Sequence, residues 1–145
     1  MKKKAEQFRK AQYKDIDHIL ELYNELSPKP LRDRKVLVRA IHFPCTEVYV
    51  LIIDGEIIGT GTISHRIVPD SGFVGFIDSV VVSGEHRGKG LGIFITEKLL
   101  EIARARQYIR VELTSNPARI AANALYKKMG FTKRATNALV YHLEE

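Results

Sequence analysis

The chain has 145 residues, 45% of them hydrophobic and 28% charged, a composition typical of one globular domain with a single core. Its one cysteine, Cys45, excludes an internal disulfide, and no apolar run approaches the roughly 20 residues that a membrane-spanning helix needs. The formal charge of +6 fits a basic surface or a polyanionic small ligand, and scattered cations without an aromatic-basic pattern argue against nucleic acid. The basic N-terminal residues are not followed by an apolar stretch, so we expect no signal peptide and a soluble, cytoplasmic protein with one domain over residues 1–145.

The first third of the chain predicts one strand and two helices. "EQFRKA", residues 6–11, is expected to form a strand. After Asp15, apolar residues recur at the spacing of one helix face, at Ile16, Ile19, Leu20, Tyr23 and Leu26. "SPKP" breaks this helix, and a second helix is predicted from Arg32 to His42, where Pro44 stops it.

Three long strands are predicted next. "EVYVLIID", residues 47–54, and "EIIGTGTISHRIV", residues 56–68, form a hairpin around the tight turn at Asp54-Gly55. "PDSG" is a second turn, and "FVGFIDSVVV", residues 73–82, is the third strand.

The second half predicts alternating helices and strands. Helical spacing after a glycine-rich turn places apolar residues at Leu91, Ile95, Leu99 and Ile102. "YIRVELT", residues 108–114, predicts a strand, and a helix is expected from Asn116 as cap and Pro117 as first residue to its end at Gly130. The tail, residues 131–145, predicts two more strands. Strands and helices mixed in this order indicate an α/β domain.

The turn "RGKGLG", Arg87 to Gly92, has a composition suited to binding an anion. It is not a P-loop, because only three residues separate Gly84 from Gly88-Lys89, and its glycine spacing is not that of a dinucleotide-binding fingerprint. Glycines still let backbone N–H groups approach an anion, and a helix N-terminus adds partial positive charge. We infer a pyrophosphate site; the alternative is a plain strand-to-helix turn with surface cations.

Two motifs in the chain resemble the signatures of the GNAT family of N-acetyltransferases. Arg87-x-x-Gly90-x-Gly92 matches the family's acetyl-CoA signature, (Gln/Arg)-x-x-Gly-x-(Gly/Ala). "ALYKKMGF", residues 124–131, is similar to the second signature, a helix ending in Leu-Tyr-x-Lys-x-Gly-Phe. The resemblance extends over residues 47–131. It implies an acyl-CoA N-acyltransferase fold, with a central mixed, mostly antiparallel sheet flanked by about four helices.

The resemblance also implies where acetyl-CoA, the co-substrate, would bind. The residues whose backbone N–H groups would hold its pyrophosphate are Arg87, Gly88, Lys89, Gly90, Leu91 and Gly92. The residues that would pair with the pantetheine arm like an added strand are Val80, Val81 and Val82. The thioester would lie where the strands over residues 73–82 and 108–114 splay apart. Asn116 or Asn123 would contact the cofactor, although a helix cap is the favoured alternative for Asn116.

Tyr126 is the candidate general acid, from its place in the second signature. Arg119, Asn123 and Tyr126 recur at i, i+4 and i+7, so they form one polar stripe of the predicted helix. The alternative is a tyrosine that packs through its ring and keeps its hydroxyl in water.

Asp78 is the candidate general base, because it interrupts an apolar strand. Strand alternation places it on the same face as Phe76, Val80 and Val82, where burial would raise its pKa. The alternative is a carboxylate bound to backbone N–H groups in a bulge. His65 and Glu112 are further candidates for the base. The resemblance alone implies an oxyanion donor at a backbone N–H near Val80 or Val81.

The sequence leaves the acceptor open. "FIDSVVVSGEHRGKGLG", residues 76–92, is similar to the glucosamine-6-phosphate N-acetyltransferase branch, and a protein N-terminal amine is another option. We hypothesise an acetyl-CoA-dependent N-acetyltransferase that acts on a primary amine of a small molecule or peptide by direct attack in a ternary complex. The alternative is a non-catalytic CoA-binding sensor or partner-binding module. The five histidines lack ligand spacing, so no metal is expected, and the resemblance suggests a homodimer.

Overall fold

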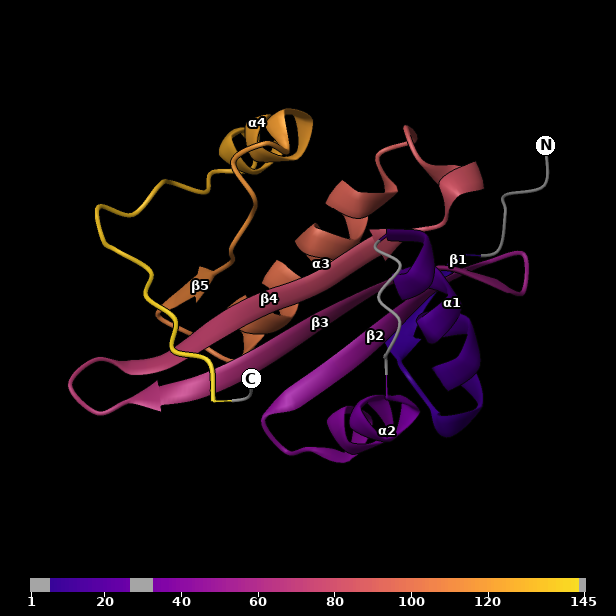
Figure 1. Cartoon of the computed structure of the whole chain (residues 1–145), viewed down its shortest axis with the longest axis horizontal. Coiled ribbons are helices and arrows are strands. Elements are labelled where there is room, and N and C mark those ends of the chain that lie inside the picture. The colour runs from indigo at the N-terminus through magenta and orange to yellow at the C-terminus, as the bar shows by residue number, and fades with distance from the viewer. Residues whose placement is uncertain (1–5, 27–32, 144–145) are drawn as a thin grey trace. The chain divides into compact units, whose positions relative to one another are not determined.

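A computed structural model describes residues 6–26 and 33–143 of the chain (Figure 1). The chain divides into two units, Met1–Thr114 and Ser115–Glu145. The prediction of one domain over residues 1–145 stays a prediction.

The first unit is built on a five-stranded sheet in the order β1-β2-β3-β4-β5. The strands are β1 (Glu6–Lys10), β2 (Thr46–Ile53), β3 (Glu56–Val68), β4 (Gly72–Val82) and β5 (Arg110–Glu112). The first four run antiparallel to their neighbours, and β5 runs parallel to β4. The predicted mixed, mostly antiparallel sheet is therefore confirmed. The predicted strand over residues 108–114 is shortened to the three residues of β5.

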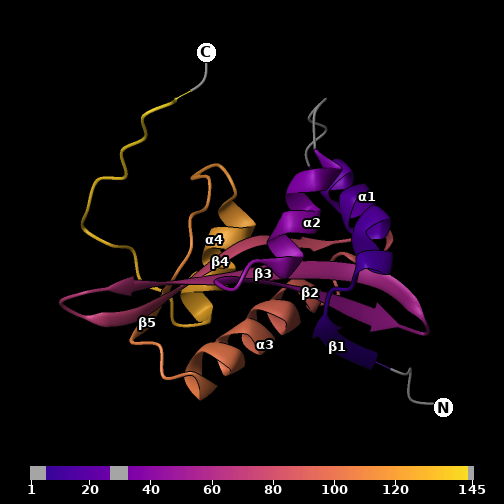
Figure 2. The same ribbon diagram turned by 90° about the horizontal axis from the view of Figure 1, so that it is seen from below.

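Helices cover both faces of this sheet. The helices are α1 (Ile16–Leu26), α2 (Arg34–His42) and α3 (Leu91–Ala105), with short 3-10 turns η1 (Tyr13–Asp15) and η2 (Gly84–His86). Figure 2 shows α1 and α2 on one face of the sheet and α3 on the other. The second helix was expected from Arg32, but that residue lies outside the described ranges, and the observed helix begins after Asp33, whose carboxylate accepts a hydrogen bond from the Lys35 N–H at 2.8 Å.

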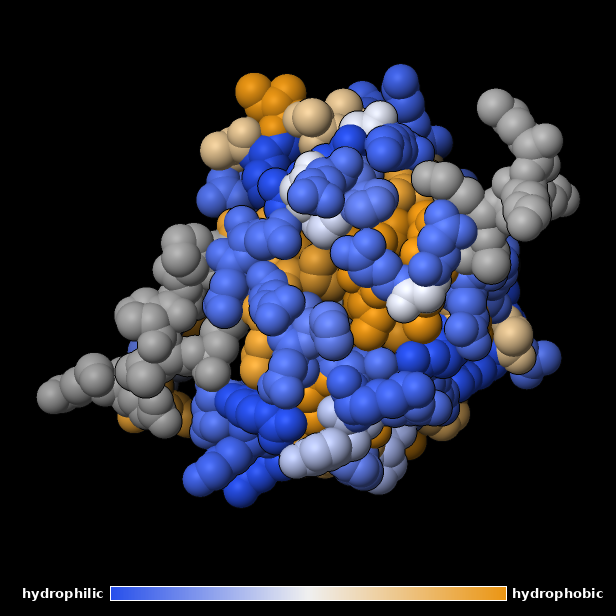
Figure 3. Space-filling model, turned by 90° about the vertical axis from the view of Figure 1, so that its right-hand side faces the viewer, coloured by the Kyte–Doolittle hydropathy of each residue, from blue (hydrophilic) through white to orange (hydrophobic). Residues whose placement is uncertain are grey.

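Each face of the sheet has its own apolar core. The core under α3 contains Leu51, Ile63, Ile77, Ile95 and Leu99, among others. The core under α1 and α2 contains Ile16, Ile19, Leu37, Val48 and Val50. At the surface, polar side chains surround the apolar ones that remain visible in Figure 3.

Glycines in β3 allow α3 to lie close to the sheet. A Cβ atom added to Gly59 would lie 2.7 Å from Ile95 Cδ1, and one added to Gly61 would lie 2.7 Å from Ile95 Cγ2. Real Cβ atoms do not approach carbon so closely, so side chains at these positions would push the helix away. Gly59 and Gly61 thereby determine how closely α3 packs on the sheet. The N-terminus of α3 follows the glycine-rich turn.

Glu47 ties the end of α3 to the sheet. Its carboxylate accepts hydrogen bonds from Arg106 at 2.6 and 2.8 Å and pairs with Lys10 at 2.6 Å. Burial by itself would raise the pKa of Glu47, but the bonds from Arg106 and Lys10 outweigh it and lower that pKa to about 2. Burial, together with the neighbouring Glu47, raises the pKa of Tyr49 to about 12.

The second unit contains α4 (Ile120–Lys128), whose C-cap is Met129 and which is followed by Gly130 at φ +98°, the stop that the sequence predicts. The predicted start is wrong. Asn116 closes a preceding turn, because its side-chain oxygen accepts from the Ala118 N–H at 2.9 Å, and the residue at the N-cap of α4 is Arg119. Pro117 belongs to that turn and not to the helix.

The two strands predicted for the tail are also absent from the structure. Residues 131–143 form neither helix nor strand. A strand needs a paired neighbour as well as suitable side chains. Residues 132–137 are mostly polar and offer no alternating apolar face, which explains why the sequence pattern was insufficient here. Residues 144–145 lie outside the described part.

Candidate active site

A β-bulge in β4 shapes the strand at Asp78. Thr62 lies opposite Asp78 and Thr60 lies opposite Val81, so β4 has one residue more than β3 between these pairs. Ser79 accommodates the extra residue with φ +52°, a conformation that costs free energy in a residue other than glycine. Bulges of this kind redirect side chains and backbone groups, and they are common beside active sites.

The bulge overturns one expectation about the face on which Asp78 lies. Uninterrupted alternation places Asp78 with Val80 and Val82. In the structure Val80 and Val82 pack with Ile77 on the core under α3. Because Ile77 and Asp78 are adjacent in the strand, they point to opposite faces. Asp78 therefore lies on the face away from α3, and the extra residue at the bulge is the physical reason.

The pKa of the Asp78 carboxyl group suits a general base. Its side chain is exposed, yet the surrounding protein displaces part of its hydration, and this desolvation raises its pKa above the ordinary value. A carboxylate with a raised pKa holds a proton more tightly and is a better proton acceptor.

The other two candidate bases have local packing or pairing. His65 packs in an aromatic group with Phe73 and Tyr108, with ring centroids 6.0 and 5.7 Å away. Glu112 accepts a hydrogen bond from Arg110 Nε at 2.7 Å. These contacts are consistent with a structural role for both residues.

The ladder between β4 and β5 is short. Only Val74 to Phe76 pair with Arg110 to Glu112, whereas β4 continues to Val82. Within the described residues, the β5 side of β4 beyond Phe76 therefore has no strand partner. An unpaired edge of this kind can accept an extended ligand through main-chain hydrogen bonds.

The glycine-rich turn connects this edge to α3. Gly88 and Gly90 have φ of +78° and +76°, and Gly90 is the N-cap residue of α3. A Cβ atom added at either position would meet nothing within 4 Å, so these glycines serve backbone conformation and leave open space beside the turn. The first N–H groups of α3 have no partner within the helix, and they point out of its N-terminal end.

Hydrogen bonds hold the segment before this turn in place. The Ser83 N–H donates to the Ile58 carbonyl at 2.8 Å, and Ser83 Oγ lies 2.8 Å from His86 Nδ1. Arg87 Nε donates to the Val82 carbonyl at 3.0 Å. The Gly84 N–H donates to the carboxylate of Glu25, in α1, at 2.7 Å. Sequence reasoning missed Glu25, since no local pattern indicates a contact across 59 residues.

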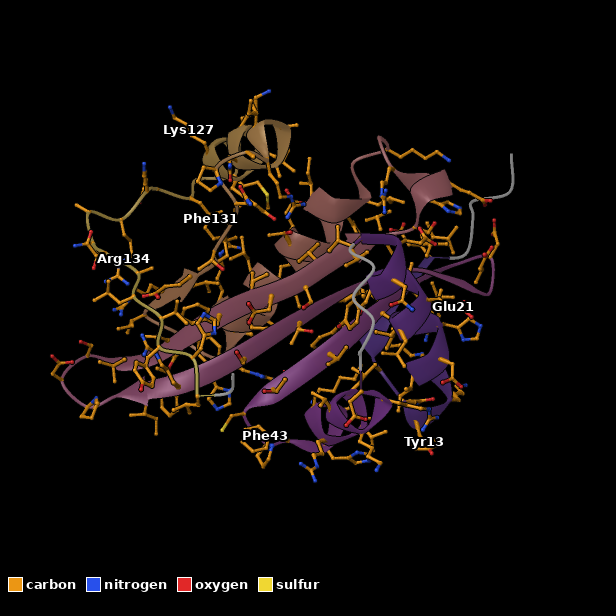
Figure 4. The ribbon with its side chains drawn as sticks, viewed as in Figure 1. Tyr13, Glu21, Phe43, Lys127, Phe131 and Arg134 are labelled. Atoms are coloured by element: carbon orange, nitrogen blue, oxygen red, sulfur yellow. The ribbon has the colours of Figure 1, made fainter. Side chains whose placement is uncertain are left out.

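The second unit places Tyr126 in the last turns of α4. Its ring packs edge-on against Phe131, which Figure 4 labels, with centroids 5.8 Å apart. The Phe131 N–H donates to the Tyr126 carbonyl at 3.0 Å, so the Gly130 turn fixes this aromatic pair. The Asn123 amide donates to the Asn116 carbonyl at 3.0 Å. Both asparagine side chains therefore have bonds within the unit, and contact of either with a cofactor stays a prediction.

The described residues contain neither a membrane-spanning helix nor a cluster of metal ligands. No helix there is long and apolar enough to cross a membrane. No three His, Cys, Asp or Glu side chains in those residues gather where they could hold a metal ion.

Comparison with known proteins identifies the family. Residues 14–131 match the model of the "Acetyltransferase (GNAT) family". This match covers most of the chain, and the chain belongs to that family.

Two rice proteins (Oryza sativa subsp. japonica) are among the curated relatives. The chain is 30% identical over 90 residues to probable glucosamine 6-phosphate N-acetyltransferase 2, covering 61% of this chain and 52% of the relative. It is 28% identical over 131 residues to glucosamine 6-phosphate N-acetyltransferase 1, covering 84% and 78%. The chain thus matches about half the length of the first of these proteins.

Solved structures share the fold. A putative acetyltransferase from Agrobacterium tumefaciens str. C58 has a TM-score of 0.82 at 23% identity, covering 94% of this chain and 99% of that one. Aminoglycoside N-acetyltransferase AAC(6')-Iy, solved in complex with CoA, has a TM-score of 0.81 at 16% identity, covering 99% and 97%. These similarities confirm the predicted fold class.

Proposed function

We propose that the protein binds acetyl-CoA at the glycine-rich turn and transfers its acetyl group to a primary amine. The observation that carries this proposal is the turn itself, where Gly88 and Gly90 adopt positive φ at the N-terminus of α3 beside open space. Membership of the GNAT family supports the reaction class.

The turn has the properties needed to bind a pyrophosphate. Backbone N–H groups from Arg87 to Gly92, together with the N-terminal end of the α3 dipole, suit a dianionic group. The side chains of Arg87 and Lys89 are exposed there and add two full positive charges. The Arg87 bond to the Val82 carbonyl holds one of these charges in place before any ligand arrives.

The unpaired edge of β4 suits the pantetheine arm. In this proposal the main-chain groups of Val80, Val81 and Val82 bind the arm as they would an added strand. The Val82 carbonyl already accepts one bond from Arg87, and a carbonyl oxygen has a second lone pair for another donor. A backbone N–H of Val80 or Val81, next to the bulge, is assigned to the developing oxyanion.

The reaction then needs one proton acceptor and one proton donor. The amine nitrogen attacks the thioester carbon, a C–N bond forms, and the C–S bond breaks. Asp78 takes the proton that the amine loses, directly or through water, which its raised pKa favours. Tyr126 is assigned as the donor to the departing thiolate. A thiol has a pKa near 8.5 and an alkylamine near 10.4, so deprotonation of the amine is the larger problem.

Glucosamine 6-phosphate is the first acceptor to consider. The names of the two rice relatives support it, as does the alignment with one of them across 84% of this chain. A peptide N-terminal amine is the second acceptor class. A CoA-binding module without turnover is the alternative function.

The test is a panel of amines assayed for CoA release from acetyl-CoA. It contains glucosamine 6-phosphate, glucosamine without the phosphate, a peptide with a free N-terminus and the same peptide with a blocked one. Turnover with one free amine and not with its matched control supports the proposal. Tight CoA binding without turnover of any amine supports the module.

A further inference from the structure

Glu25 links the last turn of α1 to the start of the glycine-rich segment. Its Oε2 accepts a hydrogen bond from the Gly84 N–H at 2.7 Å. Gly84 is the first residue of η2, so its N–H lies at the beginning of a helical turn, where no carbonyl of the same turn can accept it. A carboxylate from a distant helix supplies that acceptor.

The same carboxylate oxygen lies near Arg87. The distance from Glu25 Oε2 to Arg87 Nη2 is 3.9 Å, while Arg87 Nε donates to the Val82 carbonyl. Both side chains are about half exposed, so this pair is weak by itself. Its geometric effect is to place the Arg87 guanidinium between two acceptors, one on β4 and one on α1.

We propose that Glu25 is a positioning residue for the cofactor-binding turn. It acts by accepting the hydrogen bond of the Gly84 N–H, and the inference rests on the proposed binding of CoA at this turn. A segment held in its bound conformation loses less conformational entropy when the ligand arrives, so its affinity is higher.

The charge of Glu25 acts in the opposite direction, which makes the inference testable. A carboxylate near the turn repels a pyrophosphate. If positioning dominates, loss of the hydrogen bond weakens CoA binding. If repulsion dominates, loss of the charge strengthens it. Glu25→Gln separates the two effects, because its amide oxygen can still accept from Gly84 but carries no charge.

The experiment is titration calorimetry with CoA on the full chain, with Glu25→Ala, Glu25→Gln and the control Glu21→Ala. Glu21 is exposed one helical turn earlier on α1 (Figure 4). We expect Glu25→Ala to raise the Kd for CoA about tenfold, the size of one net hydrogen bond. Glu25→Gln is expected to stay within about threefold of the wild type, and Glu21→Ala to match it. Hydrogen exchange at the Gly84 amide is expected to quicken in Glu25→Ala alone.

Other outcomes overturn the inference. A wild-type Kd in Glu25→Ala shows that Gly84 needs no acceptor. Equal losses in Glu25→Ala and Glu25→Gln assign the effect to charge pairing with Arg87, and tighter binding in both assigns it to repulsion. Equal melting temperatures of the unliganded variants establish that changes in Kd do not arise from unfolding. If the wild type itself binds no CoA, it is the proposed function that fails.

Discussion

At the scale of single residues, Asp78 shows what a sequence can and cannot indicate. A carboxylate inside an apolar strand is visible in the sequence, and the direction of its pKa shift was expected from burial. The face on which it lies was not predictable, because one extra residue at Ser79 reverses the alternation. A bulge depends on pairing with another strand, which a local pattern does not contain.

Replacing Asp78 tests its role as the base. We expect Asp78→Asn to lower kcat/KM about 100-fold near pH 7, within the usual range for a proton acceptor. The loss is expected to shrink as pH rises toward 9, because more of the acceptor amine is then deprotonated in solution. The measurement is kcat/KM from pH 6 to 9 for both proteins. A loss that does not vary with pH would assign the proton to water or another residue.

Glu47 offers a residue-scale test of stability. Its pKa is about 2 in the folded protein against 4.5 ordinarily, so its contribution to stability is complete above about pH 5 and is lost as pH falls toward 2. We expect Glu47→Gln to reduce the free energy of unfolding by about 1–2 kcal/mol at pH 7. The difference from the wild type should diminish by pH 3, as measured by urea unfolding.

A matched control for Glu47 is the ion pair of Lys98 and Glu101 on the surface of α3, whose Nζ and Oε2 atoms lie 3.1 Å apart. Glu101→Gln is expected to change stability by less than about 0.5 kcal/mol. Equal effects of the two substitutions at pH 7 would contradict the role given to the Glu47 cluster.

At the scale of elements, the sequence predicted best where apolar periodicity is long. The three strands β2 to β4 and the helix α3 were predicted to within a few residues, because burial repeats their pattern many times. The start of α4 was misplaced because Asn116 favours a turn as readily as a cap. The prediction of two strands in the tail was wrong because a strand forms only when it pairs with another strand.

Packing between α3 and β3 gives an element-scale prediction. We expect Gly61→Ala to destabilise the protein by about 1–3 kcal/mol, since its Cβ would lie 2.7 Å from Ile95 and 3.1 Å from Leu99. The control is Gly92→Ala, in the first turn of α3, whose nearest atom would be 4.0 Å away. It should leave stability unchanged or raise it slightly. Equal effects in urea unfolding would show that the helix can shift without cost.

At the scale of the whole molecule, the element order and two short signatures sufficed to predict the fold class and the family. The contacts that organise the site were not predictable in this way. Glu25 and Gly84 are far apart in sequence, and backbone donors have no signature in side-chain letters. The sequence therefore predicted which turn would bind the cofactor, and the structure shows which contacts hold that turn.

The central claim is that acetyl-CoA binds at the glycine-rich turn. The measurement that tests it most directly is thermal unfolding of the wild type and of Gly90→Glu with acetyl-CoA, with NAD and ATP as controls. A ligand at 100 times its Kd stabilises a protein by about 2.7 kcal/mol, which is a shift of several degrees for a chain of this size. The glutamate would place a negative charge and a side chain where Gly90 has φ +76°. We predict a shift with acetyl-CoA in the wild type, little with NAD or ATP, and none in a folded Gly90→Glu variant. No shift in the wild type, or an equal shift in the variant, would contradict the claim.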